Sequence, residues 1–441
     1  MSAGRRKKKS ARGRPAPKRP AETVAISRIA QQGDGEAALA DGTRVFVPLT
    51  LPGDEVHIQP GARRGDGVAA SVLEWIEKQP RNDPICGVFG KCGGCQLQHL
   101  PAASYDAWKS DAIRTALSRH GLSIEPEPLR KVPLDSRRRA TLAFVMTASG
   151  PVLGFNEAYA DRIVGMDGCP LLALPLARLW APLRTFCAET LPAPSRADVR
   201  ITAADTNAVE IVVAANVDLD LSRREAIAAF AETHDVARFC WQQPNEAPEP
   251  VVQRRPVTLA IGKAKIELPM GGFLQPSAAG ESILQELVMA GVGDASQIAD
   301  LYCGVGTFTF VLASAGKHVF AVDDNARQIA ALDQAAGRAG LGGHVETAVR
   351  DLRASPLAPK ALEGLNAVIF DPPRAGAKSQ AEAIADSDVA RVVAVSCNPS
   401  TMARDLRILV DGGYRIDRLT PVDQFPMSYH VEAVAVLSRP G

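Results

Sequence analysis

The stretch Ile298–Phe308, IADLYCGVGTF, constrains most strongly what this chain can fold into. An apolar run ends at Asp300 and breaks into a turn with Gly304 and Gly306, and a helical pattern follows. A strand, a glycine turn and a helix in this order open a nucleotide pocket in an open α/β sheet, because glycine lets the backbone approach a ligand closely. The alternative interpretation is an ordinary tight turn in a sheet.

The residues after the turn favour S-adenosylmethionine over a dinucleotide. A dinucleotide motif would have a third glycine where this chain has Thr309. The next apolar run, His318–Val322, ends at Asp323, whose carboxylate can accept hydrogen bonds from both hydroxyls of a ribose. The missing glycine and the acidic strand end together indicate the methyl-donor cofactor.

Length and composition indicate a soluble protein of several domains. The chain of 441 residues is too long for one hydrophobic core. Its hydrophobic content of 46% and charged content of 22% are typical of a globular protein. Its apolar runs fall short of the roughly 20 residues that a membrane span needs, and it opens without a signal-peptide pattern. We therefore expect a cytoplasmic protein with no membrane partner.

The net charge of +1 hides a basic N-terminal segment. Residues 1–20 hold nine Lys or Arg and no acid, so the rest of the chain sums to −8. Such a segment, interrupted by Pro and Gly, is expected to be a disordered tail. Attraction to nucleic-acid phosphates and simple solubilisation are both open interpretations of its charge.

Residues 21–78 predict a small all-β barrel, because short strand-like runs alternate with Gly and Asp turn signals. The expected strands are Thr23–Ile29, Glu36–Leu39, Arg44–Pro48, Glu55–Pro60 and Val68–Trp75. The segment GDGEAALADGTRVFVPLTLPGDEV resembles the TRAM domain, an RNA-binding barrel attached to RNA-modifying enzymes. We therefore expect an RNA-binding barrel here.

Four cysteines form a candidate metal site. Cys86, Cys92 and Cys95 have the spacing C-x5-C-x2-C, and Cys169 stands alone in DGCPLL. Two glycines between the last close pair free the backbone to direct N–H groups at the sulfurs. Four thiolates can hold either zinc or an iron–sulfur cluster, and the spacing leaves both open.

The middle of the chain predicts a helix and then a second α/β layer. From Pro101 to about His120, apolar residues recur at helical spacing and are expected to be core contacts. Residues from about 126 to 268 alternate short strands with helices. Within them Arg137, Arg138 and Arg139 stand at the head of a strand, where either a surface charge run or contacts to RNA phosphates would explain them.

After Gly272 the pattern predicts a doubly wound parallel sheet closed by an antiparallel hairpin. The expected strands are Gln297–Tyr302, His318–Asp323, His344–Val349, Ala367–Asp371, Arg391–Cys397 and His430–Ser438, with helices at Phe308–Ala315, Ala326–Ala339, Gln380–Ala385 and Thr401–Leu409. In such sheets ligands bind beyond the carboxyl ends of the strands. The polar residues expected at those ends are Asp300, Asp323, Asp351, Asp371 and Cys397.

Two of these strand ends indicate chemistry. Asp371 precedes two prolines, which stiffen the loop and leave its carboxylate facing the crevice. Cys397 lies on a strand-to-helix turn, where a helix N-terminus lowers the pKa of a thiol, so we expect a nucleophile there. Cys303, within the glycine turn, is expected to pack beneath the cofactor.

The motifs LYCGVGTF, DPPRAG, SCNPST and HVEAVAVLS follow one another as in the RNA uracil-C5 methyltransferases, and the chain resembles this family over nearly its whole length after Pro20. With the TRAM-like barrel and the CGGC phrase, it is most similar to the branch that acts on 23S ribosomal RNA. The resemblance implies a class I S-adenosylmethionine-dependent methyltransferase fold, an RNA substrate that we expect to be 23S rRNA, and no obligate protein partner.

The resemblance also implies the roles of particular residues. It makes the four cysteines ligands of a [4Fe-4S] cluster, Cys397 the nucleophile that adds to uracil C6, and Glu432 the base that removes the C5 proton. Phe273 is a candidate stacking partner for the target base. The implied cofactor contacts are Gln275, Tyr302, Thr307, Asp323, Asp351 and Asp371, together with Gly304 and Gly306 of the turn. Ser277 replaces an asparagine that the family usually carries.

The expected domains are the tail (1–20), the barrel (21–78), a central domain with the cluster motif (79–268) and the catalytic domain (269–441).

Three other functions compete with this interpretation. A transfer-RNA uracil methyltransferase would share every catalytic residue. A radical methylthiotransferase would need C-x3-C-x2-C, which this chain lacks. A non-enzymatic RNA-binding iron–sulfur protein would need neither Cys397 nor Glu432.

Overall fold

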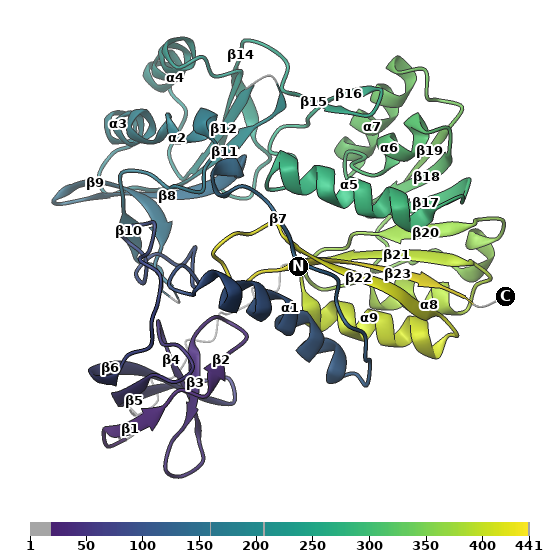
Figure 1. The fold of residues 1–441 in the computed structure, drawn as a ribbon. Coiled ribbons are helices and arrows are strands. Elements are labelled where there is room, and N and C mark those ends of the chain that lie inside the picture. Colours follow the sequence, from purple (N-terminus) through teal and green to yellow (C-terminus); the bar gives the residue numbers. More distant parts are fainter. Residues whose placement is uncertain (1–18, 159, 206–207, 440–441) are drawn as a thin grey trace, which may run out of the picture. The chain divides into compact units, whose positions relative to one another are not determined.

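The computed structural model describes residues 19–158, 160–205 and 208–439. They divide into two compact units, one ending at Asn82 and the other beginning at Asp83 (Figure 1). The predicted basic tail lies, apart from its last two residues, outside the described residues. Within these ranges the helices are too short or too polar to cross a membrane.

The first unit is a six-stranded sheet in the order β1-β5-β6-β4-β3-β2. Its strands are β1 (Glu22–Ala25), β2 (Arg28–Ile29), β3 (Gly35–Ala38), β4 (Arg44–Val47), β5 (Glu55–Arg64) and β6 (Gly67–Glu77). The expected first strand is divided in two, because the chain changes its partner: β1 pairs with β5, whereas the Ser27 N–H donates to the Glu36 carbonyl of β3. Alternate residues such as Val45, Val47, Val56 and Ile58 face one small core. The strands therefore agree with the sequence pattern, and the TRAM assignment stays a prediction.

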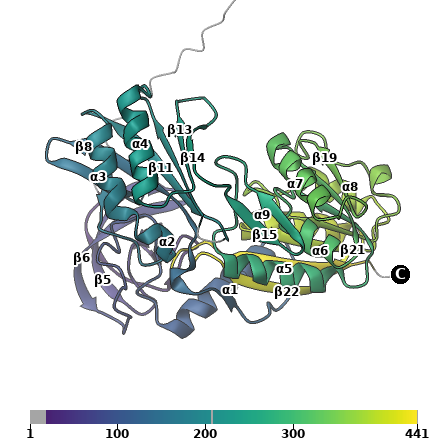
Figure 2. The same ribbon diagram turned by 90° about the horizontal axis from the view of Figure 1, so that it is seen from above.

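The middle of the second unit is a seven-stranded sheet in the order β10-β9-β8-β11-β12-β13-β14. Its strands are β8 (Arg139–Thr147), β9 (Gly150–Asn156), β10 (Ile163–Gly165), β11 (Arg196–Ala203), β12 (Val209–Ala215), β13 (Arg238–Gln242) and β14 (Glu249–Gln253). The associated helices are α2 (Leu174–Ala177), α3 (Trp180–Thr190) and α4 (Leu221–Thr233). Helices α3 and α4 lie side by side on one face of the sheet (Figure 2), where Phe186 of α3 and Phe230 of α4 place their ring centroids 5.0 Å apart.

The last part of the second unit is an eight-stranded sheet in the order β19-β18-β17-β20-β21-β23-β22-β7. Its strands are β7 (Arg130–Lys131), β17 (Gln297–Leu301), β18 (His318–Asp323), β19 (Val345–Val349), β20 (Ala367–Phe370), β21 (Arg391–Ser396), β22 (Arg415–Asp423) and β23 (Glu432–Ser438). Strands β17 to β21 are parallel, and β23 runs antiparallel between β21 and β22. The predicted doubly wound sheet with an antiparallel hairpin is confirmed.

Helices cover both faces of this sheet (Figure 1). They are α1 (Ala102–Ser118), α5 (Ala278–Val292), α6 (Thr309–Ser314), α7 (Ala326–Arg338), α8 (Lys378–Ala385) and α9 (Pro399–Asp411), and a hairpin of β15 (Thr258–Ile261) and β16 (Ala264–Glu267) directly precedes α5. Asn325 and Asn398 cap α7 and α9 by accepting hydrogen bonds from backbone N–H groups of the first turn. These caps fix where each helix begins, directly after a strand end that carries an acidic residue or a cysteine.

The segment that contains α1 and β7 belongs structurally to the catalytic sheet. Ile113 and Leu117 of α1 are buried in one cluster with Leu406 and Leu409 of α9, and β7 pairs with β22. The predicted domain boundary near residue 268 therefore stays a prediction, since residues from Asp83 onwards form one compact unit.

The three arginines at the head of β8 differ in their surroundings. Arg138 is buried, its guanidinium lies 2.7 Å from Glu281 of α5, and its Nε donates to the Gln275 carbonyl at 3.0 Å. Arg139 donates to the Leu274 carbonyl and lies 4.7 Å from the centroid of the Phe273 ring. The surface alternative is wrong for Arg138, which instead holds the backbone on which Gln275 stands.

Replacing Arg138 with methionine should destabilise the protein by about 3–5 kcal/mol, because Glu281 would stay buried without its partner. The matched control is Arg130→Met, which breaks an exposed ion pair with Glu286 on the same helix and should cost less than about 1 kcal/mol. Urea unfolding of the full-length proteins measures both. Equal losses for the two variants would contradict this account.

Candidate functional site

The glycine turn after β17 is tightly wound. Tyr302, Gly304 and Gly306 have φ angles of 61°, 59° and 95°, all in the left-handed region. A side chain at Gly306 would place its Cβ 2.8 Å from the ring of Phe310. The turn can form only because glycine accepts this backbone, and it brings the N–H groups before α6 to the carboxyl edge of the sheet.

A buried carboxylate lies under this turn. Asp300 accepts a hydrogen bond from the Thr309 hydroxyl at 2.6 Å, and its second oxygen has no partner among the described residues. Burial, together with the charges of Asp371 and Asp323, raises the pKa of Asp300 to about 7. An unpaired buried oxygen beside a tight glycine turn fits a site that receives a polar ligand. Cys303 is buried in the core at this turn, and its place beneath the cofactor stays a prediction.

Asp323 stands at the end of β18 and faces the same turn. It accepts hydrogen bonds from the N–H groups of Gly304 (3.0 Å) and Asn325 (2.9 Å), one to each oxygen. Each oxygen keeps a lone pair, so the carboxylate can still accept from ligand hydroxyls. Asp351, after β19, is exposed and turns back to accept from the N–H groups of Arg353 and Ala354.

Two buried glutamines link the carboxylates of Asp371 and Glu432 at the same edge of the sheet. Gln275 donates to Asp371 at 3.2 Å, and Gln424 donates both to Gln275 Oε1 at 3.0 Å and to Glu432 at 3.3 Å. Burial raises the pKa of Asp371 to about 7, and burial and the Asp371 charge raise the pKa of Glu432 well above its ordinary value. Two carboxylates with raised pKa values can hold or accept a proton near neutral pH.

Cys397 lies at the end of β21, one residue before the cap of α9. Asn398 caps that helix by accepting from the Ser400 N–H, and its own amide donates to the Arg374 carbonyl at 2.9 Å. The sheet therefore brings Cys397, Asp371 and Glu432 to one edge, close enough for the two carboxylates to affect the thiol. Glu432 reaches this edge because β23 is antiparallel and begins where its neighbours end.

The expected lowering of the thiol pKa is wrong for the protein without substrate. Burial, together with the charges of Glu432 and Asp371, raises the pKa of Cys397 to about 12, and the Arg374 charge opposes this only in part. Desolvation and two nearby carboxylates thus outweigh a helix N-terminus that begins beyond the cysteine. Ionisation of the thiol requires that a carboxylate is neutralised or that a substrate changes the surroundings.

The four motif cysteines are partly buried and influence one another. Burial raises the pKa of Cys95 to about 12, and the charges of Cys169, Cys92 and Cys86 contribute to that rise. The Gly94 N–H points at the Cys92 sulfur at 3.4 Å. Among the residues that the structure describes, no group of three or more His, Cys, Asp or Glu side chains is placed to hold a metal ion.

The residues around the predicted stacking partner have clear structural roles. Phe273 is 50% exposed, whereas Gln275, two residues on, is buried. Ser277, the departure from the family pattern, is the cap of α5 and accepts from the Gly280 N–H at 3.0 Å. A serine can fill this position because caps need a short side-chain oxygen.

Sequence reasoning missed Gln424 and strand β22, which precedes it. The motif that identified β23 begins only at His430, and a single glutamine between two apolar runs carries no recognisable pattern. The signal that could have found β22 is the strand-like run that ends at Asp423, antiparallel to a predicted neighbour.

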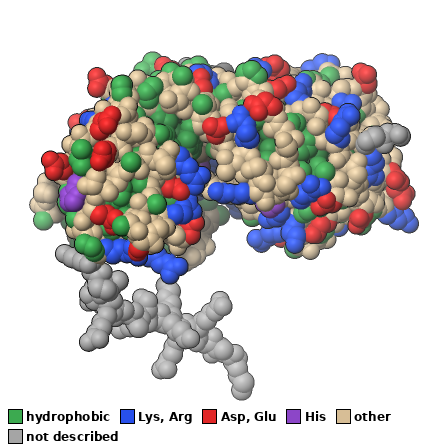
Figure 3. Space-filling model, turned by 60° about the horizontal axis from the view of Figure 1, so that its bottom comes forward, with side chains coloured by type: hydrophobic (Ala, Val, Ile, Leu, Met, Phe, Trp, Pro, Cys, Tyr) green, Lys and Arg blue, Asp and Glu red, His purple; other side chains and the backbone are tan. Residues whose placement is uncertain are grey.

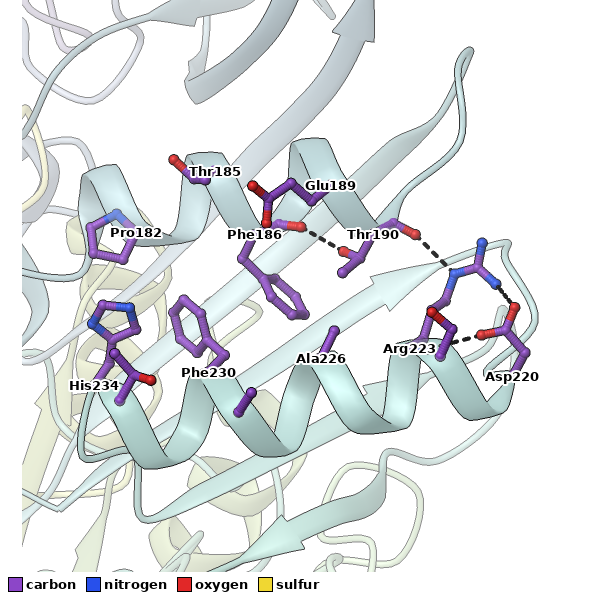
Figure 4. A pocket seen from close by; sticks show the side chains of 13 residues that line it. Pro182, Thr185, Phe186, Glu189, Thr190, Asp220, Arg223, Ala226, Phe230 and His234 are labelled. Atoms are coloured by element: carbon purple, nitrogen blue, oxygen red, sulfur yellow. Dashed lines mark hydrogen bonds and ion pairs between the residues drawn. The ribbon is translucent and has the colours of Figure 1, made fainter.

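A separate pocket of about 530 Å³ lies between α3 and α4 (Figure 4), and none of the predicted site residues lines it. At one end Phe230 packs against Phe186 and His234. At the other end Arg223 pairs with Asp220, which caps α4, and donates to the Thr190 carbonyl. Arg223, Asp220 and Thr190 thus bind one another, and the predicted site residues lie elsewhere, at the carboxyl edge of the eight-stranded sheet.

A doubly wound sheet of this strand order, with a glycine turn after β17 and acidic residues at the following strand ends, defines a class I S-adenosylmethionine-dependent methyltransferase. The solved structure of the Pyrococcus abyssi tRNA (uracil-54, C5)-methyltransferase with S-adenosyl-L-homocysteine has this fold. It matches 94% of this chain and 99% of its own with a TM-score of 0.73 and 24% identity.

The chain belongs to the RNA uracil-C5 methyltransferase family and is an S-adenosylmethionine-dependent enzyme. A family model described as tRNA (Uracil-5-)-methyltransferase matches residues 360–440. An RNA methyltransferase of Brucella suis is 39% identical over 94% of this chain and 97% of that protein. The 23S rRNA (uracil(1939)-C(5))-methyltransferase RlmD of Chromohalobacter salexigens is 34% identical over 95% of this chain and 90% of that protein. The predicted resemblance is confirmed, and the non-enzymatic alternative is wrong.

Substituting Gly306 by alanine should weaken S-adenosylmethionine binding by about tenfold or more, because the new Cβ forces the Phe310 ring away and strains the turn. The control is Gly337→Ala in α7, where a Cβ meets no other atom within 4 Å and should stabilise the helix by about 0.5–1 kcal/mol. Titration calorimetry with the cofactor tests both variants. Unchanged affinity in the Gly306 variant would separate the turn from the cofactor site.

Proposed function

We propose that this enzyme methylates C5 of a specific uridine in 23S ribosomal RNA through a transient covalent bond between Cys397 and uracil C6. The observation that supports the mechanism most is the meeting of Cys397, Asp371 and Glu432 at one sheet edge. The ribosomal substrate rests on similarity to a relative named for 23S rRNA over nearly the whole chain. Transfer RNA is the second candidate, since the family model and the similar solved structure are named for it.

We assign the cofactor to the crevice beside the glycine turn. Asp323 would accept from the ribose hydroxyls, and Asp300 has a free oxygen beneath the turn. The other assigned contacts are Gln275, Tyr302, Gly304, Gly306, Thr307, Asp351 and Asp371. S-adenosylmethionine, when bound, supplies an electrophilic methyl group to C5 of the activated uracil.

The residues of the chain perform the remaining steps. The Cys397 thiolate adds to C6, which moves electron density onto C5 and makes it nucleophilic. After C5 is methylated, Glu432 takes the C5 proton, the C5–C6 double bond reforms and the thiolate leaves. Burial and the Asp371 charge raise the pKa of Glu432, which makes its carboxylate a stronger base for this step.

The target base must leave its stack to reach Cys397, and we assign Phe273 as its stacking partner. Its ring is half exposed and is held on one side by Arg139 at 4.7 Å. An aromatic face backed by a guanidinium is a suitable surface for a base that has left its stack.

We assign Cys86, Cys92, Cys95 and Cys169 to a [4Fe-4S] cluster. Burial and the charges of neighbouring thiols raise the pKa of Cys92, Cys95 and Cys169, and a backbone N–H points at the Cys92 sulfur. Each ligand of such a cluster binds a different iron, so the four thiols need not converge on one ion. The cluster would supply a structural crosslink, since methyl transfer moves no net electrons.

We assign the first unit to RNA binding as a TRAM domain. Trp75 of β6 is 37% exposed, and Lys78 and Arg81 lie 5.1 and 4.8 Å from its ring centroid. Aromatic rings flanked by basic side chains are common in single-stranded RNA sites. Lys and Arg side chains also gather in several groups on the face shown in Figure 3.

Protein purified without oxygen should be brown and should contain about four irons per chain, given four thiolate ligands. Cys92→Ser should lose the colour and bind RNA less tightly, while Cys187→Ser, which changes a buried core cysteine, should keep the iron. Metal analysis and absorption spectra measure the outcome. Stoichiometric zinc without iron would refute the cluster.

Glu432→Gln should add the thiolate and accept the methyl group but then stall, because elimination requires loss of the C5 proton. It should accumulate a protein–RNA adduct that survives denaturing gels, and Cys397→Ala should form no adduct and no product. RNA with 5-fluorouridine should trap the wild-type enzyme in the same way.

Methylation by Cys397→Ala would sink the assignment of the nucleophile. An inactive Glu432→Gln enzyme without an adduct would leave Cys397 in place but require another base, for which Asp371 is the next candidate. Mapping of methylated uridines in ribosomal and transfer RNA from a deletion strain separates the two substrates.

A further inference from the structure

The loop between β22 and β23, residues 424–431, contacts the buried glutamine and carboxylate network at its start and Arg374 near its end. Gln424 at its start contacts Gln275 and Glu432, and His430 near its end contacts Arg374, with Nδ1 3.2 Å from the guanidinium. The Arg374 charge is the group that opposes the raised pKa of Cys397. The shape of this loop therefore affects both the carboxylates and the nucleophile.

A buried lysine on α1 contacts both ends of this loop. Lys109 has no exposed surface, and its ammonium lies 2.8 Å from Asp423, the residue before Gln424. The same ammonium donates to the Phe425 carbonyl at 3.3 Å and to the His430 carbonyl. The ammonium therefore makes one ion pair and two hydrogen bonds, and all three contacts are with residues at the ends of this loop.

A second group from α1 supports the same loop. The Tyr105 hydroxyl donates to Asp423 at 2.5 Å and accepts from the Met427 N–H at 3.0 Å. Met427 has a φ of 62°, a backbone conformation that costs energy unless neighbouring contacts hold it. The N–H groups of Gln96 and Leu97 complete the support by donating to the Met427 carbonyl.

From these contacts we infer that Lys109 is a positioning residue for catalysis, which holds the 424–431 loop so that Gln424 and Arg374 stay aligned with the carboxylates and Cys397. A buried Lys–Asp pair is not needed here for stability alone, because well-packed apolar groups can replace both partners of a buried ion pair without loss. The three acceptors of the lysine, in contrast, come from Asp423, Phe425 and His430, so one side chain sets the separation of the two loop ends. The inference rests on the proposed covalent mechanism.

The test compares Lys109→Met, Lys109→Arg and a control in the full-length enzyme. The control is Lys131→Met, which breaks an exposed ion pair with Asp106 on the same helix α1. Each protein is assayed with an RNA transcript that the wild type methylates and with the same transcript containing 5-fluorouridine. Cofactor affinity is measured by calorimetry.

We expect Lys109→Met to lower kcat and the rate of adduct formation together by at least about tenfold, because a shift of about 1 Å in a catalytic group can cost about 100-fold. Cofactor affinity and KM for RNA should stay within about threefold of wild type, since the glycine turn and the RNA-binding surface are untouched. Lys109→Arg should recover part of the rate by keeping the charge and the donors, and Lys131→Met should behave as wild type.

A Lys109→Met enzyme with the wild-type adduct rate would overturn the inference, and so would a rate loss matched by an equal loss of cofactor affinity. Should Lys109→Met fail to fold, Tyr105→Phe removes one hydroxyl beneath Met427 and should slow adduct formation with unchanged cofactor affinity; an unchanged rate would overturn the inference. A wild-type enzyme that forms no adduct would instead refute the proposed mechanism.

Discussion

The candidate site depends on two carboxylates that are placed together away from water. Burial raises the pKa of both carboxyl groups, the Asp371 charge adds to the rise for Glu432, and both charges act on the thiol of Cys397. Such a pair is costly unless neighbouring groups hydrogen-bond it, and Gln275 and Gln424 supply those bonds. The fold keeps both glutamines in place, because Gln424 directly follows β22 and Arg138 holds the backbone of Gln275.

The sequence predicted those parts of the fold and the candidate site that follow from patterns within short stretches of the chain. The order of apolar runs predicted the doubly wound sheet, and motif residues such as Cys397 and Asp371 lie at the strand ends as expected. Parallel strands bring their carboxyl ends to one edge, so residues far apart in the chain could be placed together without a structure. Their roles in cofactor binding and catalysis stay predictions.

What the sequence could not show are contacts that depend on three-dimensional packing. Lys109 lies on the buried face of α1, where the spacing of Tyr105, Trp108 and Ile113 predicted only core, and a charged residue there gives no sign of its partner. Asp423 is more than 300 residues away. The pKa of Cys397 was expected to fall because a helix N-terminus is visible in the sequence, whereas the desolvation and carboxylates that raise it are not.

Buried cations from the middle of the chain reach the segments that carry site residues. Arg138 holds the Gln275 carbonyl, and Lys109 holds the loop that begins at Gln424. Arg238, paired with Glu210, donates to the Leu268 carbonyl, and Glu210 accepts from the Gly271 N–H. These contacts fix backbone rather than side chains, so the segments are rigid on the side away from the ligands. The hydrogen-bonded network of Gln275, Gln424 and Glu432 is thus supported by backbone that buried cations of the preceding segments hold in place.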